Sequence, residues 1–138
     1  MDEFIYIHRL SRYRFTLAHE VGHVVFHSDL ISSIHPQSVS EWNKFVLGID
    51  EETYGWLEWQ AYSFAAAVLV PRVSLKQNFC KELELLQPKI DLIRSKGLSV
   101  ESSQDYIVNA IEAKLIGIYG VSNDVLNKRI SKEHGLEL

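Results

Sequence analysis

The sequence is poor in several features that mark particular classes of protein. Its 138 residues include a single cysteine, Cys80, so no disulfide can form within the chain, which suits a reducing compartment. The longest apolar run, FAAAVLV, is far too short to span a bilayer. Basic residues are not in excess, and a formal net charge of -4 makes a poor non-specific binder of nucleic acid or anionic membrane. The opening residues, MDEFIYIHRL, are acidic at the start and do not form a secretory signal. These absences predict a cytoplasmic protein.

The composition is that of a folded chain with one core. Hydrophobic residues make up 46% of the sequence and charged residues 23%. The length fits one domain over residues 1–138.

The N-terminal half carries patterns of both strand and helix. Phe4 to His8 (FIYIH) is rich in β-forming residues and predicts a short edge strand. Residues 12–27 are apolar on nearly all sides of a helix, which indicates a buried helix. Residues 28–50 read as a long loop, and helical character resumes near Thr53 and runs to Leu69.

The C-terminal half predicts further helices. Residues 73–86 and 87–97 read as two separate helices, the second ending at Gly97. The next would begin at an N-cap, Ser102 or Ser103, and end at Gly120. A last one would begin at Ser122 and end at Gly135. The sequence therefore predicts an α+β fold that is mostly helical, with a small N-terminal sheet.

The stretch FTLAHEVGHVVFH places His19 and His23 four residues apart, with Glu20 between them. Residues i and i+4 of a helix share one face, so two imidazoles can converge on one ion. Glu20 lies about 100° around the helix from His19, too far round to join them easily as a ligand but able to lean over a water on the same metal. This is the H-E-x-x-H arrangement of zinc peptidases, in which the glutamate is the general base.

The competing interpretation is a chance occurrence, because three fixed residues in five positions arise at random in any large set of chains. The context favours a metal site. Two histidines and a glutamate lie in an apolar helical segment, where burying them without a purpose would be costly. Gly22 weakens a helix, and the close approach of another backbone would explain its presence.

His27 extends the four-residue spacing but cannot share the same ion. The helix rises about 12 Å from His19 to His27, whereas zinc–nitrogen bonds are about 2 Å long. We expect His27 to support the ligands or to be stabilised by the helix dipole.

A catalytic zinc needs a third protein ligand, and Glu58 is the candidate. It lies in an apolar helical segment and shares a face with the small residues Ala61 and Ala65, which would let that helix pack close to the histidine helix. The alternative is a surface glutamate on a hydrophobic helix, and spacing alone does not decide between them. Tyr54 and Tyr62 could stabilise an oxyanion, but core packing is the prediction for each.

Two linked motifs carry a resemblance to a known family. RFTLAHEVGHVVFH and EWQAYSFAAAVLVP resemble the R-F-T-x-A-H-E-x-G-H-x-x-x-H and E-x-x-A-x-x-F-A-x-x-L-L-x-P blocks of the ImmA/IrrE metallopeptidases of bacteria and phages. GIYGVSNDVLNKRI is similar to the family's closing segment. Matching positions are Arg14, Phe15, Thr16, Ala18, Gly22 and His27, then Glu58, Ala61, Phe64, Ala65, Leu69 and Pro71, and finally Val121, Ser122 and Arg129.

The resemblance implies a zincin-like fold, with the small sheet packed on the H-E-x-x-H helix, and one zinc per chain held by His19, His23 and Glu58. Glu20 would be the general base. Gln60 stands where many members carry a second glutamate, which points to Glu58 as the ligand. The implied substrate is a protein, a helix-turn-helix transcriptional repressor. Members usually have a longer segment before the R-F-T block than the 13 residues found here, so part of the usual N-terminal portion would be lacking.

Two alternatives remain beside the peptidase. The last predicted helix could be the recognition helix of a DNA-binding motif, but its modest basic charge argues against direct DNA binding. A non-catalytic antirepressor could also keep the zinc fold and sequester a repressor without cleaving it.

Overall fold

The computed structural model describes the backbone of residues 3–97 and 100–132, and the side chains of residues 9–97 and 106–132. Within these ranges the chain forms six helices and no strand. They are α1 (Glu3–Ile34), α2 (Val39–Gly48), α3 (Glu51–Leu69), α4 (Arg72–Ser95), α5 (Val100–Tyr119) and α6 (Asn123–Lys132).

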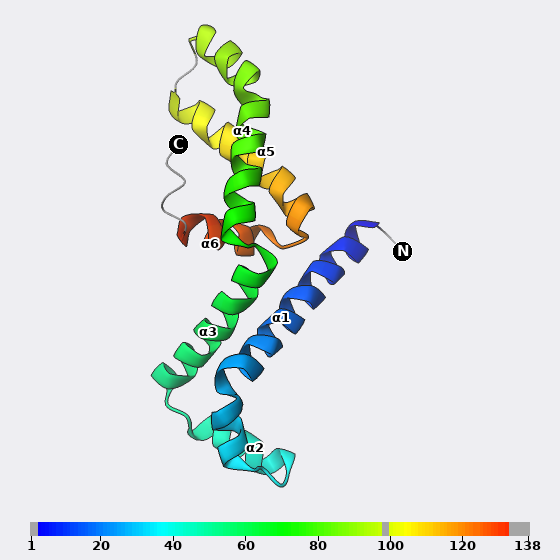
Figure 1. Cartoon of the computed structure of the whole chain (residues 1–138), viewed down its shortest axis with the longest axis vertical. Coiled ribbons are helices and arrows are strands. Elements are labelled where there is room, and N and C mark those ends of the chain that lie inside the picture. Colours follow the sequence, from blue (N-terminus) through cyan, green and yellow to red (C-terminus); the bar gives the residue numbers. More distant parts are fainter. Residues whose placement is uncertain (1–2, 98–99, 133–138) are drawn as a thin grey trace.

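The helices form two antiparallel pairs (Figure 1). α1 lies beside α3, with the short α2 joining them at one end of the molecule. α3 leads into α4, which continues away from α1, and α5 returns along α4. α6 crosses near the point where α3 meets α4, so it lies between the two pairs and contacts both α3 and α5.

The predicted N-terminal sheet is wrong for the part of the chain that the structure describes. Phe4 to His8 belongs to the first turns of α1 instead of an edge strand. No glycine or proline separates this segment from the helical residues that follow, so the helix extends backwards at one hydrogen bond per added residue. A single strand with no partner would have left those backbone groups unpaired.

The predicted loop over residues 28–50 is also wrong. α1 continues to Ile34, and α2 fills most of the remainder. The Ser38 hydroxyl accepts a hydrogen bond from the backbone N–H of Glu41 (3.2 Å), and the Glu41 carboxylate accepts one from Gln37 N (2.7 Å). This reciprocal pair is close to a capping box, whose S-x-x-E signal was present in the sequence.

The later helices follow the prediction with two changes at their boundaries. α3 ends before Pro71 as expected, but residues 72–95 form one helix that runs through Pro88. A proline inside a helix removes a hydrogen bond at a cost of about 3 kcal/mol. Phe79 and Ile90, buried on either side of Pro88, hold the helix against its neighbours despite that loss.

The ends of α5 and α6 are decided by glycine and serine. α5 begins at Val100, ahead of both predicted N-caps, Ser102 and Ser103, so that prediction is wrong. It ends at Gly120, whose φ of 59° is a left-handed conformation that favours glycine, as predicted. Ser122 caps α6 by accepting from Val125 N (3.3 Å), which confirms its predicted role. The predicted end of this helix at Gly135 lies outside the described residues.

The hydrophobic core lies in the second half of the chain. Its fully buried side chains include Val70, Leu75, Ile111, Leu115 and Leu126, from the end of α3 to α6. α1 is not the buried helix that its apolar sequence predicts. Its described residues Tyr13, Leu17, Val24 and Phe26 are each more than half exposed, because α1 packs chiefly against α3 on one side. None of the described helices is long and apolar enough to cross a membrane.

Candidate metal centre

The α1–α3 pair brings together three side chains with metal-binding groups. His19 and His23 project from consecutive turns of α1 toward α3, where they meet Glu58. His19 Nε2 lies 3.1 Å from Glu58 Oε2, and His23 Nε2 lies 3.4 Å from Glu58 Oε1. The two Nε2 atoms are 3.0 Å apart. The three residues that the sequence singled out as ligands therefore converge.

The approach of the two helices depends on small residues at the crossing. A Cβ on Gly22 would lie 3.0 Å from the Cα of Ala61 and 3.1 Å from its carbonyl oxygen. Ala61 and Ala65 are both fully buried, and Ala61 is the one that faces Gly22. The expected close contact of Gly22 with these alanines is thus present at Ala61, and it sets the histidines within reach of Glu58.

The spacing of the three groups fits one small cation. Four-coordinate zinc has bonds of about 2.0–2.2 Å to nitrogen and oxygen, which places neighbouring tetrahedral ligands about 3.3–3.5 Å apart. The separations here are 3.0, 3.1 and 3.4 Å. A neutral imidazole has a single N–H, so a proton on one Nε2 could satisfy part of this group, whereas at least one of the three contacts would still lack a donor–acceptor pair. A cation between the groups would satisfy all three contacts.

His27 contacts His23 and lies outside the group of three converging side chains. It is 6% exposed, its Nδ1 lies 2.9 Å from Nδ1 of His23, and its Nε2 lies 2.9 Å from Oε1 of Gln60. An amide oxygen only accepts, so His27 Nε2 must donate, which leaves His27 Nδ1 as the acceptor in a neutral ring. His23 then donates through Nδ1 and keeps a free lone pair on Nε2, the atom that faces His19 and Glu58.

Glu20 lies beside the same site. It lines a pocket of about 440 Å³ together with His19, His23 and Glu58. The side chain is exposed, whereas the two histidines and Glu58 are half-buried between the helices. Glu20 is therefore next to the three converging groups without being one of them.

Comparison with known protein families identifies the chain. Residues 3–131 match the model of the IrrE N-terminal-like domain, a peptidase family of the ImmA/IrrE type. The chain belongs to this metallopeptidase family. The comparisons with curated proteins and with solved structures gave no match.

Membership of the ImmA/IrrE family makes the chain a metallopeptidase with a protein substrate and a possible metal site at His19, His23 and Glu58. Two arginines of its motifs have structural roles that the sequence did not reveal. Arg14 donates to the carbonyl oxygens of Tyr119 (3.0 Å) and Gly120 (3.3 Å), and Arg129 donates to that of Val70 (3.1 Å). Each guanidinium thus caps the C-terminal end of another helix, where a positive charge is favoured.

The two tyrosines differ in their environments. Tyr62 packs against the core and against the Phe15 ring (centroids 5.0 Å apart), so its predicted packing role is confirmed. Tyr54 is 44% exposed, so the prediction of core packing is wrong for it. The negative charge of Glu58, partial burial and a hydrogen bond with that carboxylate raise the pKa of Tyr54. Its hydroxyl therefore keeps its proton near the metal ligands and is available as a donor.

Proposed function

We propose that this chain is a zinc-dependent endopeptidase in which His19, His23 and Glu58 hold the ion and Glu20 is the general base. The observation that carries the proposal is the convergence of three side chains, from two helices, with contacts of 3.0 to 3.4 Å between their ligand atoms, beside Glu20. Bound zinc would polarise the peptide carbonyl and lower the pKa of a bound water to roughly 7.

The side chains of this chain perform the proton transfers. Glu20 removes a proton from the attacking water and later passes it to the leaving amine. Tyr54 is a hydroxyl donor for the negative charge that develops on the carbonyl oxygen, because it lines the same pocket as Glu20 and Glu58. His27 and Gln60 hold the His23 ring in the tautomer that offers Nε2.

The proposed substrate is a helix-turn-helix transcriptional repressor, and its cleavage would relieve repression. The support is the family resemblance of both motif blocks together with the partial exposure of the site, which opens onto a pocket that a protein segment can enter. A repressor encoded next to the gene for this chain is the first substrate to test.

The Glu20→Gln variant tests the enzyme directly. It keeps all three ligands, so we expect one zinc per chain by metal analysis, with cleavage of the repressor reduced by at least about 100-fold, the lower range for a lost general base. Glu58→Ala is the matched change at a ligand, and it should weaken zinc binding strongly. If Glu20→Gln relieves repression in cells as well as the unaltered chain does, the protein acts by sequestering the repressor and the enzyme proposal fails.

A further inference from the structure

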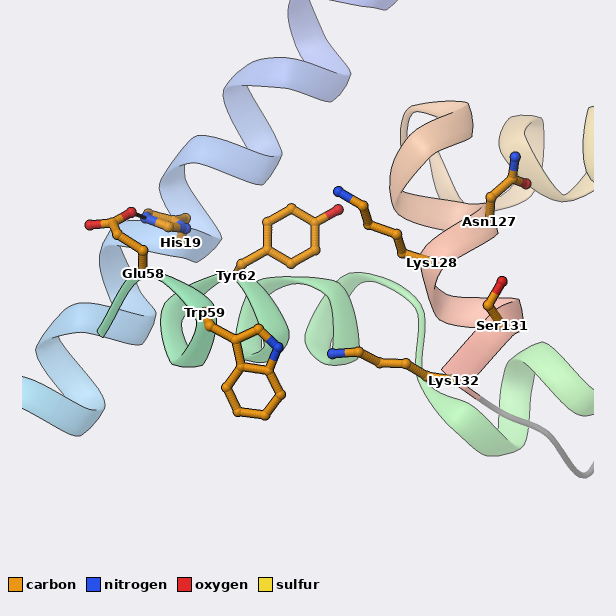
Figure 2. Close-up of a pocket in the computed structure, with 8 residues that line it drawn as sticks. All are labelled: His19, Glu58, Trp59, Tyr62, Asn127, Lys128, Ser131 and Lys132. Carbon is orange, nitrogen blue, oxygen red and sulfur yellow. Dashed lines mark hydrogen bonds and ion pairs between the residues drawn. The ribbon is translucent and has the colours of Figure 1, made fainter. Parts of the chain in front are cut away.

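Two pockets meet at the metal group. The first is the 440 Å³ pocket that Glu20 lines, and it extends from the metal group toward α2. The second, of about 640 Å³, extends toward α6 and is drawn in Figure 2. His19 and Glu58 line both pockets, so the ligands stand at the boundary between them. A peptide whose scissile bond lies at the metal would place the residues before the bond in one pocket and those after it in the other.

The pocket toward α2 suits a large apolar side chain. Beyond the metal group its walls are mostly hydrophobic and come from the end of α1, from α2 and from the residue that follows α2: Leu30, Ile31, Trp42, Phe45, Val46 and Ile49. The Trp42 and Phe45 rings lie 5.9 Å apart between centroids and form an aromatic surface. An apolar substrate residue bound there would leave water, which is the main source of binding free energy for such a side chain.

The pocket toward α6 combines aromatic rings with two lysines. Lys128 Nζ lies 4.8 Å from the centroid of the Tyr62 ring, and Lys132 Nζ lies 4.8 Å from that of Trp59. Figure 2 shows both ammonium groups extending from α6 toward these rings of α3. Contacts with the aromatic faces restrain two otherwise flexible side chains, so their charges are already held at the groove before a substrate arrives.

The two charges are only partly neutralised. Lys128 pairs with Asp124 at 3.1 Å, whereas Lys132 donates to the neutral hydroxyl of Ser63 at 3.1 Å. The groove therefore keeps positive charge that a carboxylate can use and that repels a basic side chain. From Glu58 to Tyr62 the helix rises about 6 Å, the length of roughly two residues of an extended peptide.

We propose that the chain selects peptides with a large apolar residue on one side of the cleaved bond and an acidic residue, about two positions away, on the other. This inference rests on the proposed peptidase function. It identifies the substrate segment by its side chains rather than by the identity of the protein that carries it.

The test measures kcat/KM of the zinc-loaded chain on matched peptides in an alanine–serine background. One flanking position carries Phe or Ser, the other Glu, Gln or Lys, and each pair is made in both orders along the peptide. We expect the peptide with Phe and Glu to be the best substrate, and only one of its two orders along the peptide to be preferred. Replacing Glu by Gln should lower kcat/KM about fivefold, the upper range for an exposed ion pair, mainly through KM, and Lys should lower it further. Replacing Phe by Ser should lower it at least about tenfold.

Charge reversal on α6 assigns the effect to the two lysines. Lys128→Glu with Lys132→Glu should make the Lys peptide a better substrate than the Glu peptide, while Lys81→Glu on α4 is the matched control and should leave the preference unchanged. Circular dichroism and zinc content establish that each variant is folded and loaded. Equal cleavage of the Glu, Gln and Lys peptides, or an unreversed preference in the double variant, would overturn the inference. A failure to cleave any peptide or the repressor would contradict the peptidase function itself.

Discussion

At the scale of the residue, three histidines with the same spacing along α1 differ in what they contact. His19, His23 and His27 are each four residues apart, yet only the first two meet Glu58. His27 is the buried middle member of a chain of hydrogen bonds that runs from Gln60 to the His23 ring. In the proposed site its contribution to metal binding would be through the orientation and tautomer of His23.

Replacing His27 by phenylalanine should keep the buried volume and remove the acceptor for His23 Nδ1. We expect zinc affinity to fall about 10- to 100-fold, as for other lost partners of metal ligands. The measurement is competition with a chelating zinc indicator. His35→Asn is the control, since His35 is exposed and has a φ of 44° that asparagine tolerates. The zinc affinity of this variant should not change. A folded His27→Phe chain with unaltered affinity would show that the hydrogen bonds to His23 are dispensable.

At the scale of the element, the α1–α3 crossing is set by a residue without a side chain. Gly22 faces the backbone of Ala61 and the Phe64 ring, and added atoms there would meet main chain that cannot move aside. The separation between His23 and Glu58 depends on this contact, because the two residues come from different helices.

Gly22→Ala should lower the free energy of unfolding by about 1–2 kcal/mol, since the cost of overpacking exceeds the gain of about 1 kcal/mol in helix propensity. Zinc affinity should fall as well. Gly117→Ala is the matched control inside α5, where a Cβ would meet nothing within 4 Å, and it should stabilise the chain by up to about 1 kcal/mol. Urea denaturation of both variants gives the sign of each change in the free energy of unfolding. A more stable Gly22→Ala variant would mean that the helices can separate without penalty.

At the scale of the whole molecule, the core and the metal site occupy different halves. The buried side chains join the end of α3 to α4, α5 and α6, whereas α1 is attached through α3, through Phe15 at the edge of the core and through Arg14. A cation held by His19, His23 and Glu58 would add a further link between α1 and α3.

Removal of zinc with a chelator should therefore loosen α1 more than the core. At zinc concentrations about 100-fold above Kd, linkage gives a loss of about 2.7 kcal/mol of stability on removal, with a lower Tm. Hydrogen exchange should quicken for amides of α1 near His19 while those of α4 and α5 around Leu75 and Ile111 change little. Glu58→Ala, with its weakened site, should respond little to the chelator. Equal loss of protection in α4 and α5 would show that the ion stabilises the whole fold as one unit.

Much of the helical content follows from local rules that the sequence displays. Asp50 and Ser122 cap α3 and α6, Pro71 follows the end of α3, and Gly120 ends α5. The errors arose where a local pattern was weak or misleading. The β-forming residues Phe4 to His8 are part of a longer helix. Within residues 28–50, the N-cap signal at Ser38 lies among residues typical of a loop, so α2 was not predicted.

The sequence by itself determined which helix faces carry the candidate ligands, because the four-residue spacing of His19 and His23 and the shared face of Glu58, Ala61 and Ala65 follow from helix geometry. The tertiary structure decided what those residues meet. Only the packing of α1 on α3 revealed Gln60 as the partner of His27, and only the placement of α6 beside α3 set Lys128 and Lys132 over Tyr62 and Trp59. Those contacts join residues 33 or more positions apart, and no local periodicity carries such pairings.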